Sequence, residues 1–307
     1  MNNTKLHIII FSFNRSLQLD CLLRTLVKNL TFVDYSVSIV YHHSGKHKEG
    51  YEKLEKKYKD FPAIVFYERV REYSFIKNTF PLLFHDRNAY RYLKYKFLHS
   101  NLDNFKILTE SLILNSPCDF TMFLTDDGYF YDQVKIPDNI LEKISGDPYQ
   151  VSYRMYVGKN LKDCPDLVED NGVLQWNYYD KAMYNHWAYP FAVDATIYQS
   201  AALLNIIKPV FYHMPTTLES FVVTHCRSRK LLGKGFSPVK SNFVGLFINR
   251  VSSVGANYSG AISTDMLNDK WIEGYELEYS FPTPPNQQCL IPTEIKLMHP
   301  LNLDIIL

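Results

Sequence analysis

Two adjacent carboxylates follow an apolar stretch near the middle of the chain. The segment DFTMFLTDDGYF, residues 119–130, is apolar for most of its first half and then places Asp126 and Asp127 before Gly128. Adjacent acids are costly in a dry, unpaired setting, because like charges raise each other's pKa. A divalent cation would relieve that cost, since Mg²⁺ or Mn²⁺ takes one or two carboxylates together with water and phosphate oxygens. The pair therefore predicts a metal site, although Asp-Asp-Gly also suits an ordinary turn.

Two other predicted strands end in side chains that could bind a ligand. These residues are Ser12, Phe13, Asn14 and Arg15 in KLHIIIFSFNR, and His42, His43 and Ser44 in YSVSIVYHHSG. In a parallel α/β sheet, ligands bind beyond the carboxyl ends of the strands. We therefore expect these residues and the acid pair to contribute to one site.

The elements that would position these residues alternate between strands and helices. Ile8, Ile9 and Ile10 form a β-branched run typical of a strand covered on both faces. From Ser16, the expected N-cap, leucines recur at helical spacing up to Leu30. Further strands are expected within 35–45, 63–69, 119–130 and 149–158, and helices within 49–60, 88–115 (two stretches) and 137–144. This alternation predicts an open, mainly parallel α/β sheet flanked by helices.

The chain divides into two predicted halves that together form one continuous domain. Residues 1–150 form the regular α/β half, and residues 151–307 form a less regular half with helices at 216–230 and 264–274. The segment 281–292 is rich in proline, and we expect it to run along the surface.

Bulk composition excludes several classes of protein. With 33 basic and 32 acidic residues, the chain of 307 residues lacks the broad positive surface that nucleic-acid binding requires. The five cysteines lie far apart and predict reduced thiols. The N-terminal apolar run is too short and too polar for a signal peptide or membrane span. We expect a cytoplasmic protein.

The segments IIIFSFNR and FLTDDGYF together resemble nucleotide-sugar-dependent glycosyltransferases of the GT-A type, especially glycosyltransferase family 2. IIIFSFNR is similar to the opening strand and nucleotide-contacting loop of that family, and FLTDDGYF is similar to its metal-binding DxD motif. The resemblance covers about the first 150 residues. It implies metal-dependent, inverting transfer of a sugar from a nucleotide diphosphate sugar, such as a UDP-sugar, during polysaccharide biosynthesis. The acceptor would be a glycan or a lipid-linked saccharide, which implies peripheral association with the inner face of the membrane.

Carried onto this sequence, the resemblance implies roles for individual residues. Ser12, Phe13 and Asn14 would line the base and ribose pocket, with Arg15 beside them. Asp127 would bind Mn²⁺ or Mg²⁺, with Asp126 on the ion, the ribose or the donor sugar. Thr125 stands where the first acid of DxD is expected, and His42, His43 and Ser44 stand where an acid commonly contacts the base. We expect His43 to contribute to the nucleotide site, and at least one of the two histidines to be an ordinary strand-end residue.

An inverting transfer needs a carboxylate to take the proton of the acceptor hydroxyl. Asp194 follows aromatic residues that could stack on a sugar, and Glu219 lies near a helix start, where such enzymes often carry the base. The alternatives are a paired buried acid for Asp194 and a Thr216–Glu219 capping box for Glu219. Arg250 suits a phosphate, or else a surface salt bridge.

Two other functions remain as alternatives. A sugar nucleotidyltransferase is disfavoured, because FSFNRSLQLD contains no glycine to hold a triphosphate. A non-catalytic nucleotide-sugar-binding protein of the same fold is the other alternative. Trp176 and Trp187 are candidate stacking platforms for a sugar, but in a chain with 23 tyrosines and 20 phenylalanines we expect aromatic side chains to fill the core first.

Overall fold

The computed structural model describes residues 5–31, 34–70, 103–251, 259–279, 284–301 and 303–307. Its strands are β1 Lys5–Phe13, β2 Asp34–His42, β3 Ile64–Glu68, β4 Phe120–Thr125, β5 Gly128–Phe130, β6 Val151–Arg154, β7 Val168–Asp170, β8 Val173–Asn177, β9 Thr196–Gln199, β10 Lys234–Pro238, β11 Phe243–Leu246, β12 Glu276–Glu278, β13 Cys289–Leu290, β14 Lys296–Met298 and β15 Ile305–Ile306. Its helices are α1 Ser16–Asn29, α2 Lys48–Tyr58, α5 Phe105–Asn115, α6 Asp138–Gly146, α7 Ser200–Ile207, α8 Pro215–Arg229 and α9 Thr264–Glu273, with short 3-10 turns η1 Gly45–His47 and η3 Asn185–Ala188.

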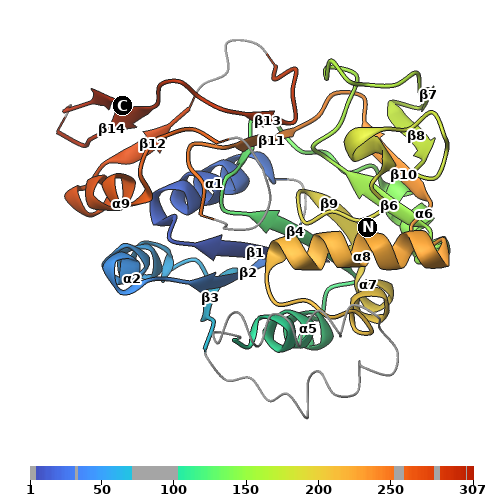
Figure 1. Ribbon diagram of the computed structural model, residues 1–307, viewed down its shortest axis with the longest axis horizontal. Coiled ribbons are helices and arrows are strands. Elements are labelled where there is room, and N and C mark those ends of the chain that lie inside the picture. The colour runs from blue at the N-terminus through green and yellow to red at the C-terminus, as the bar shows by residue number, and fades with distance from the viewer. Residues whose placement is uncertain (1–4, 32–33, 71–102, 252–258, 280–283, 302) are drawn as a thin grey trace.

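A central sheet of nine strands runs through the molecule in the order β3-β2-β1-β4-β9-β6-β10-β8-β7. The four strands from the first half of the chain pair in parallel, while β9 pairs antiparallel with both β4 and β6. The predicted fold class, an open α/β sheet flanked by helices, is confirmed (Figure 1). The antiparallel strands β7, β8 and β9 were not predicted, because each is short and lies in the less regular half.

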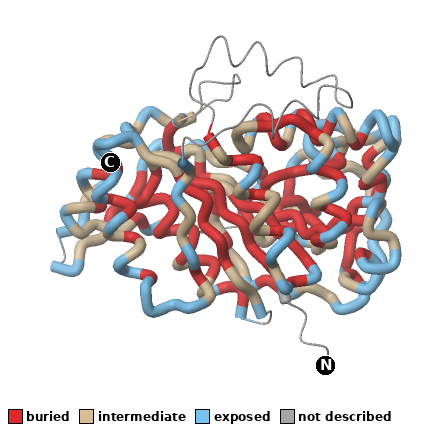
Figure 2. Tube along the Cα trace, turned by 90° about the horizontal axis from the view of Figure 1, so that it is seen from below, coloured by how far each residue is buried: buried red, intermediate tan, exposed pale blue. Residues whose placement is uncertain are grey.

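Alternate residues of β1 face opposite layers of helices. Ile8 and Ile10 pack in one apolar cluster with the leucines of α1, whereas Ile9 and Phe11 pack in a different cluster with residues of α5, α7 and α8. This is the two-sided burial predicted from the isoleucine run, and Figure 1 shows the two groups of helices on opposite sides of the sheet. Figure 2 shows the buried strands at the centre, with the exposed residues around them. Two packed layers thus fix the end of β1 in place.

Several predicted details differ from the structure. Helix α1 begins at Ser16, so Arg15 and not Ser16 holds the N-cap position. The proline-rich tail forms β13, which pairs with β11 in a smaller sheet of three strands, β13-β11-β5. The first of the two helical stretches predicted within 88–115 lies outside the described residues. In the described part of the chain, no helix has the length and apolar character to cross a bilayer.

Candidate functional site

The carboxyl ends of β1, β2 and β4 meet at one edge of the central sheet. Phe13 is in register with His42 of β2, and Phe11 is in register with Thr125 of β4. The backbone amide of Asp126 donates to the carbonyl of Phe11 at 3.1 Å, which continues the pairing one residue past β4. The three predicted clusters of site residues therefore lie together, as the parallel topology requires.

Asp126 points toward the end of β1, where protein donors surround it. One of its oxygens accepts hydrogen bonds from the Ser12 hydroxyl and the Phe13 amide, each at 2.9 Å. Its other oxygen accepts from the Arg15 guanidinium at 3.0 Å, and the Ser12 hydroxyl also lies 2.6 Å from the hydroxyl of Tyr51. Burial raises the pKa of Asp126 from 3.8 to about 6, against the opposing charge of Arg15. The Ser12 hydroxyl and the Asp126 carboxylate thus join two strand ends, and the direct contacts of these two residues to a ligand stay predictions.

Arg15 is the centre of a buried network that the sequence did not indicate. One guanidinium nitrogen lies 3.0 Å from Asp126 and 2.8 Å from Asp127, and the others donate to the side chain and the carbonyl of Asn249 at 2.9 and 2.6 Å. The Arg15 side chain is only 8% exposed. Burial would lower the pKa of Arg15, but the charges of Asp127 and Asp126 outweigh it and raise that pKa. Arg15 therefore stays charged and neutralises part of the negative charge of Asp126 and Asp127.

The donor set at this edge offers a divalent ion an open carboxylate oxygen on Asp127. One oxygen of Asp127 accepts from Arg15, while its other oxygen has no hydrogen-bond partner among the described residues. One oxygen of Asp126 already accepts two hydrogen bonds and the other accepts one from Arg15, so only the second lone pair of that other oxygen is open, and the role of Asp126 as a metal ligand stays a prediction. Within the same described ranges, no three His, Cys, Asp or Glu side chains form a metal-binding group. Mg²⁺ and Mn²⁺ need only one or two protein carboxylates when phosphates complete their shell, so Asp127 satisfies this minimum.

Phe13 and Asn14 are the half-buried members of the predicted nucleotide loop. The ring of Phe13 stacks on that of His42, with centroids 5.8 Å apart and an interplanar angle of 13°. Asn14 has a left-handed backbone, with φ of 55°, and its side-chain oxygen accepts from the amide of Ser44 at 2.8 Å. Asparagine tolerates this conformation better than most residues. The loops after β1 and β2 are thereby tied together beside a flat aromatic surface.

His43, the other predicted nucleotide contact, faces the protein on two sides. Its Nε2 lies 3.2 Å from Glu68 of β3, and its ring lies near those of Tyr41 and Tyr51, at 6.2 and 6.0 Å between centroids. These contacts match the interpretation of one histidine as an ordinary strand-end residue. A contact to the nucleotide stays a prediction for His43.

The two predicted bases, Asp194 and Glu219, interact with each other beside the end of β4. Thr125 donates a 2.6 Å hydrogen bond to Asp194, and the amide of Val193 lies 3.4 Å from a carboxylate oxygen of Glu219. Burial, followed by the charge of Glu219, raises the pKa of Asp194 to about 7, although the Thr125 hydrogen bond acts in the opposite direction. Burial also raises the pKa of Glu219, against the amide of Val193 and the charge of Arg154. A carboxyl with a pKa near neutrality can take and return a proton, as a general base must.

The local backbone supports a special role for Asp194 more than for Glu219. The residue after Asp194 is Ala195, whose φ of 37° lies in the left-handed region that alanine rarely adopts. Such strain is concentrated at functional sites. The alternative interpretation of Glu219 as a capping-box residue is wrong, because helix α8 begins at Pro215 and the hydroxyl of Thr217 accepts from the backbone before it.

The remaining predicted residues divide between surface and core. Arg250 is exposed and follows Asn249, the partner of Arg15, so its predicted contact to phosphate stays a prediction. Trp176 and Trp187 are buried, with their rings 5.0 Å apart, and the indole nitrogen of Trp176 donates to the carbonyl of Trp187 at 3.0 Å. Both tryptophans therefore belong to the core, and the idea that they are stacking platforms is wrong.

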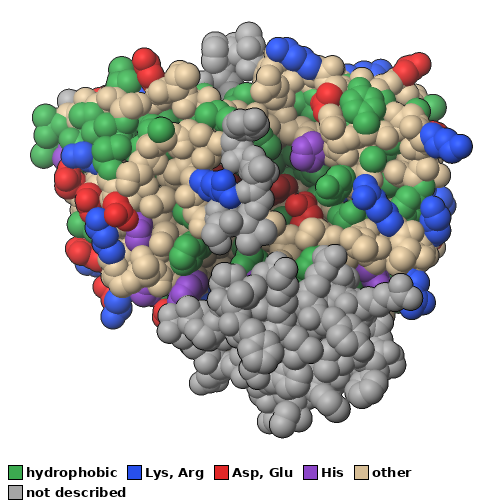
Figure 3. Space-filling model, in the orientation of Figure 1, with side chains coloured by type: hydrophobic (Ala, Val, Ile, Leu, Met, Phe, Trp, Pro, Cys, Tyr) green, Lys and Arg blue, Asp and Glu red, His purple; other side chains and the backbone are tan. Residues whose placement is uncertain are grey.

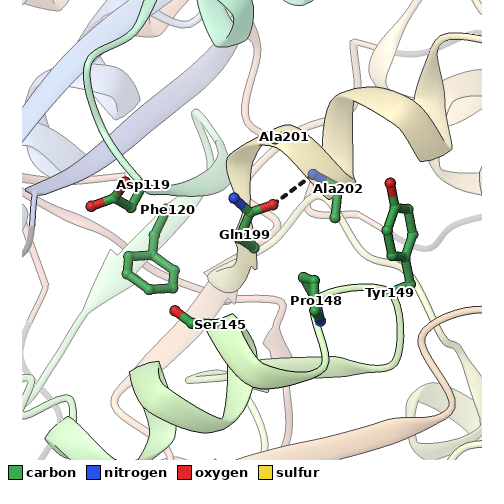
Figure 4. Close-up of a pocket in the computed structure, with 8 residues that line it drawn as sticks. All are labelled: Asp119, Phe120, Ser145, Pro148, Tyr149, Gln199, Ala201 and Ala202. Atoms are coloured by element: carbon green, nitrogen blue, oxygen red, sulfur yellow. Dashed lines mark hydrogen bonds between the residues drawn. The ribbon is translucent and has the colours of Figure 1, made fainter.

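Two open cavities lie in the described structure, one far from this edge of the sheet and the other near it. A cavity of about 350 Å³ is lined by Asp119, Phe120 and Gln199, among others, and so lies at the opposite end of β4 (Figure 4). A cavity of about 440 Å³ is lined by Asp163, Asn185, His186, Tyr189, Gln288 and Cys289. Cys289 of the larger cavity pairs with Gly245 of β11, and the next residue of β11, Leu246, donates to the carbonyl of Asp127 at 2.7 Å. The charges of Asp194, Asp127 and Glu219 also add to the burial that raises the pKa of Cys289. Figure 3 shows acidic side chains near the centre of the face drawn there.

Comparisons with known proteins give only distant similarities. No protein-family model matches the chain, and no curated protein matches it. Among solved structures, S. aureus TarS aligns at 12% identity over 78% of this chain and 36% of its own length, with a TM-score of 0.47. Its fragment 1–349 aligns at 14% identity with a TM-score of 0.46, and the same fragment in complex with UDP-GlcNAc aligns at 13% with 0.46, each over 78% of this chain. This chain spans 60% and 58% of those two fragments, and identities this low carry no information about shared site residues.

Proposed function

We propose that this protein transfers a sugar from a nucleotide diphosphate sugar, specifically a UDP-sugar, to a hydroxyl group of a saccharide acceptor. The single observation that carries the proposal is the meeting of three features at one sheet edge. These features are the FSFNR loop, the Asp126–Asp127 pair and the Asp194–Glu219 pair. The two motifs that suggested the family from the sequence are in direct contact, because the Phe13 amide donates to Asp126.

Each part of the site has a role in the proposed reaction. The Phe13–His42 surface would hold the nucleotide base, and the open oxygen of Asp127 would face the diphosphate. A Mg²⁺ or Mn²⁺ ion held by Asp127 would supply charge neutralisation to the departing diphosphate. Arg15 is fixed to Asn249 and both acids, and it keeps Asp127 in place.

Asp194 is the proposed base. Its carboxylate takes the proton from the acceptor hydroxyl while that oxygen bonds to the anomeric carbon of the donor. The bond between the anomeric carbon and the diphosphate oxygen breaks, and the nucleoside diphosphate leaves on the opposite face. This displacement inverts the configuration at the anomeric carbon. Burial, and then the charge of Glu219, raise the pKa of Asp194 toward neutrality, where a base is most effective.

A panel of nucleotide sugars tests the proposal. We expect at least one UDP-sugar to release UDP, and Asp194→Asn to slow that release by roughly 10²–10⁴-fold without changing the affinity for UDP. Full activity in Asp194→Asn would remove Asp194 from the mechanism. UDP binding without turnover of any donor would favour the non-catalytic alternative.

A further inference from the structure

The 440 Å³ cavity near Asp194 and Glu219 has no role yet in the reaction described above. Its volume falls within the range of about 300–1,000 Å³ typical of ligand sites. Its lining combines one carboxylate, two side-chain amides, one imidazole and one tyrosine ring, from Asp163, Asn185, Gln288, His186 and Tyr189. These groups can donate and accept hydrogen bonds in many directions beside an apolar ring face. The lining therefore suits a ligand with several hydroxyl groups.

Gln288 carries an unused hydrogen-bond donor at this cavity. The residue is only 8% exposed, and its side-chain Nε2 is buried without a partner in the described structure. Its backbone is fixed, because its carbonyl accepts from Gly245 at 2.9 Å and the neighbouring Asn286 carbonyl accepts from Lys162 at 3.0 Å. A buried donor without a partner is costly unless a ligand supplies an acceptor. Gln288 thus brings an unsatisfied hydrogen-bond donor to a residue that lines the cavity.

The opposite wall of the cavity is held rigidly by a buried arginine. Arg154 donates to the carbonyl of His186 at 2.8 Å and also to the carbonyl of Tyr189. These bonds fix the turn η3, in which Asn185 has a left-handed φ of 49°. The Tyr189 side chain is 39% exposed. The Arg227 guanidinium lies over the Tyr189 ring, 5.2 Å from its centroid, so only the other ring face can stack against a sugar. An aromatic ring on a fixed turn does so at a small entropic cost.

Strand pairing sets the distance between this cavity and the donor site. Gly245 of β11 is in register with Gly128 on one side and with Cys289 on the other. The backbone at Cys289 therefore lies two strand spacings, or about 10 Å, from that at Gly128, the residue after Asp127. Of the three carboxylates that act on Cys289, Asp194 acts most strongly. A ligand in the cavity would therefore lie near the proposed base.

We propose that this cavity binds the acceptor, and that the acceptor residue held there is an uncharged saccharide. This inference rests on the proposed function. An uncharged ring is favoured because the lining residues include a carboxylate but no lysine or arginine, and because further acids lie beside them. The guanidinium groups of Arg154 and Arg227 adjoin the lining, but they donate to the carbonyls of His186, Tyr189 and Ala188. An anionic sugar would bring its charge next to these carboxylates without a cation in the lining to pair with it.

Saturation-transfer NMR on the full chain with UDP present tests this subsite. The probes are the methyl glycosides of glucose, galactose and N-acetylglucosamine, with methyl glucuronide as the anionic comparison. We expect at least one neutral glycoside to bind and the glucuronide not to bind. Tyr189→Ala and Gln288→Met should each weaken the neutral glycoside about fivefold or more, since each removes a direct contact. Tyr149→Ala is the matched control, because Tyr149 is 42% exposed and lines the other cavity.

The outcomes separate the subsite from the proposed function. Absence of binding by every neutral glycoside, or equal weakening by Tyr149→Ala and Tyr189→Ala, overturns the subsite. If Tyr189→Ala weakens UDP-GlcNAc relative to UDP and leaves the glycosides unchanged, the cavity holds the donor sugar and the inference is wrong. UDP affinity, measured by calorimetry on the same samples, reports separately on the donor site.

Discussion

Replacement of Arg15 by methionine removes the buried cation that pairs with Asp126 and Asp127. The side chains of Arg15, Asp126 and Asp127 are 8%, 5% and 12% exposed, so solvent cannot replace the lost contacts. The variant leaves Asp126 with two neutral donors and Asp127 with no hydrogen-bond partner among the described residues. Removal of one member of a buried ion pair typically costs about 3–5 kcal/mol of the free energy of unfolding. We expect Arg15→Met to be destabilised by this amount near pH 7.5.

The loss in Arg15→Met should also depend on pH in a defined direction. The pKa of Asp126 is raised by folding from 3.8 to about 6, so its protonation contributes stability below about pH 4 that is lost as the pH rises through 6. The charge of Arg15 lowers this pKa, and its removal raises the pKa further. The deficit of the variant should therefore be smaller at pH 5 than at pH 7.5, by up to about 1.4 kcal/mol for each unit by which the pKa rises toward 7.5.

Urea denaturation of the wild type and variants at both pH values measures these differences. Arg229→Met is the matched control, because Arg229 is exposed in the last turn of α8, and such substitutions usually change the free energy of unfolding by less than about 0.5 kcal/mol. A deficit below about 1 kcal/mol at pH 7.5, in a range typical of exposed pairs, would refute the argument that Arg15 is a buried neutralising cation. So would a deficit that is the same at both pH values.

Glu219→Gln tests the pairing of Asp194 with Glu219, and Trp187→Ala tests the core. Burial, and then the charge of Glu219, raise the pKa of Asp194, and Glu219→Gln removes that charge. The acidic limb of the pH–rate profile, expected near pH 7, should therefore move to lower pH. A shift to higher pH would contradict the pairing of Asp194 with Glu219. Trp187→Ala should reduce the free energy of unfolding by about 3–5 kcal/mol, as for other large core residues, while the folded fraction keeps the wild-type affinity for UDP. A selective loss of ligand binding with unchanged stability would restore Trp187 as a stacking platform.

The sequence predicted the first half of the fold because its signals there are local. The β-branched run at Ile8–Ile10 and the leucine spacing from Ser16 to Leu30 each report the burial of one element, and β1 and α1 occur where these patterns placed them. The antiparallel strand β9 depends on its pairing with β4 and β6. Four residues, Thr196–Gln199, are too few to show a period, so the sequence could not predict it.

The sequence predicted that these strand ends would meet, but not the contacts among their side chains. The parallel topology brings Phe13, Asn14 and Asp127 together as expected, since the carboxyl ends of these strands share one edge. The bond between Arg15 and Asn249 joins residues 234 positions apart, and no spacing in the sequence reports it. Gln288 lies in a tail that was expected only to run along the surface. These residues act through tertiary contacts, which the pattern of a single sequence does not encode.

Calorimetric titration of UDP, with and without Mn²⁺, tests the central claim that this sheet edge is a donor site. We expect UDP to bind the wild type more tightly when Mn²⁺ is present, and Asp127→Ala to abolish that gain, because Asp127 carries the carboxylate oxygen that remains open at this edge. Asp132→Ala, at an exposed aspartate paired with Lys240, should keep the gain. UDP binding that neither Mn²⁺ nor Asp127→Ala alters, or no UDP binding in either condition, would contradict the account.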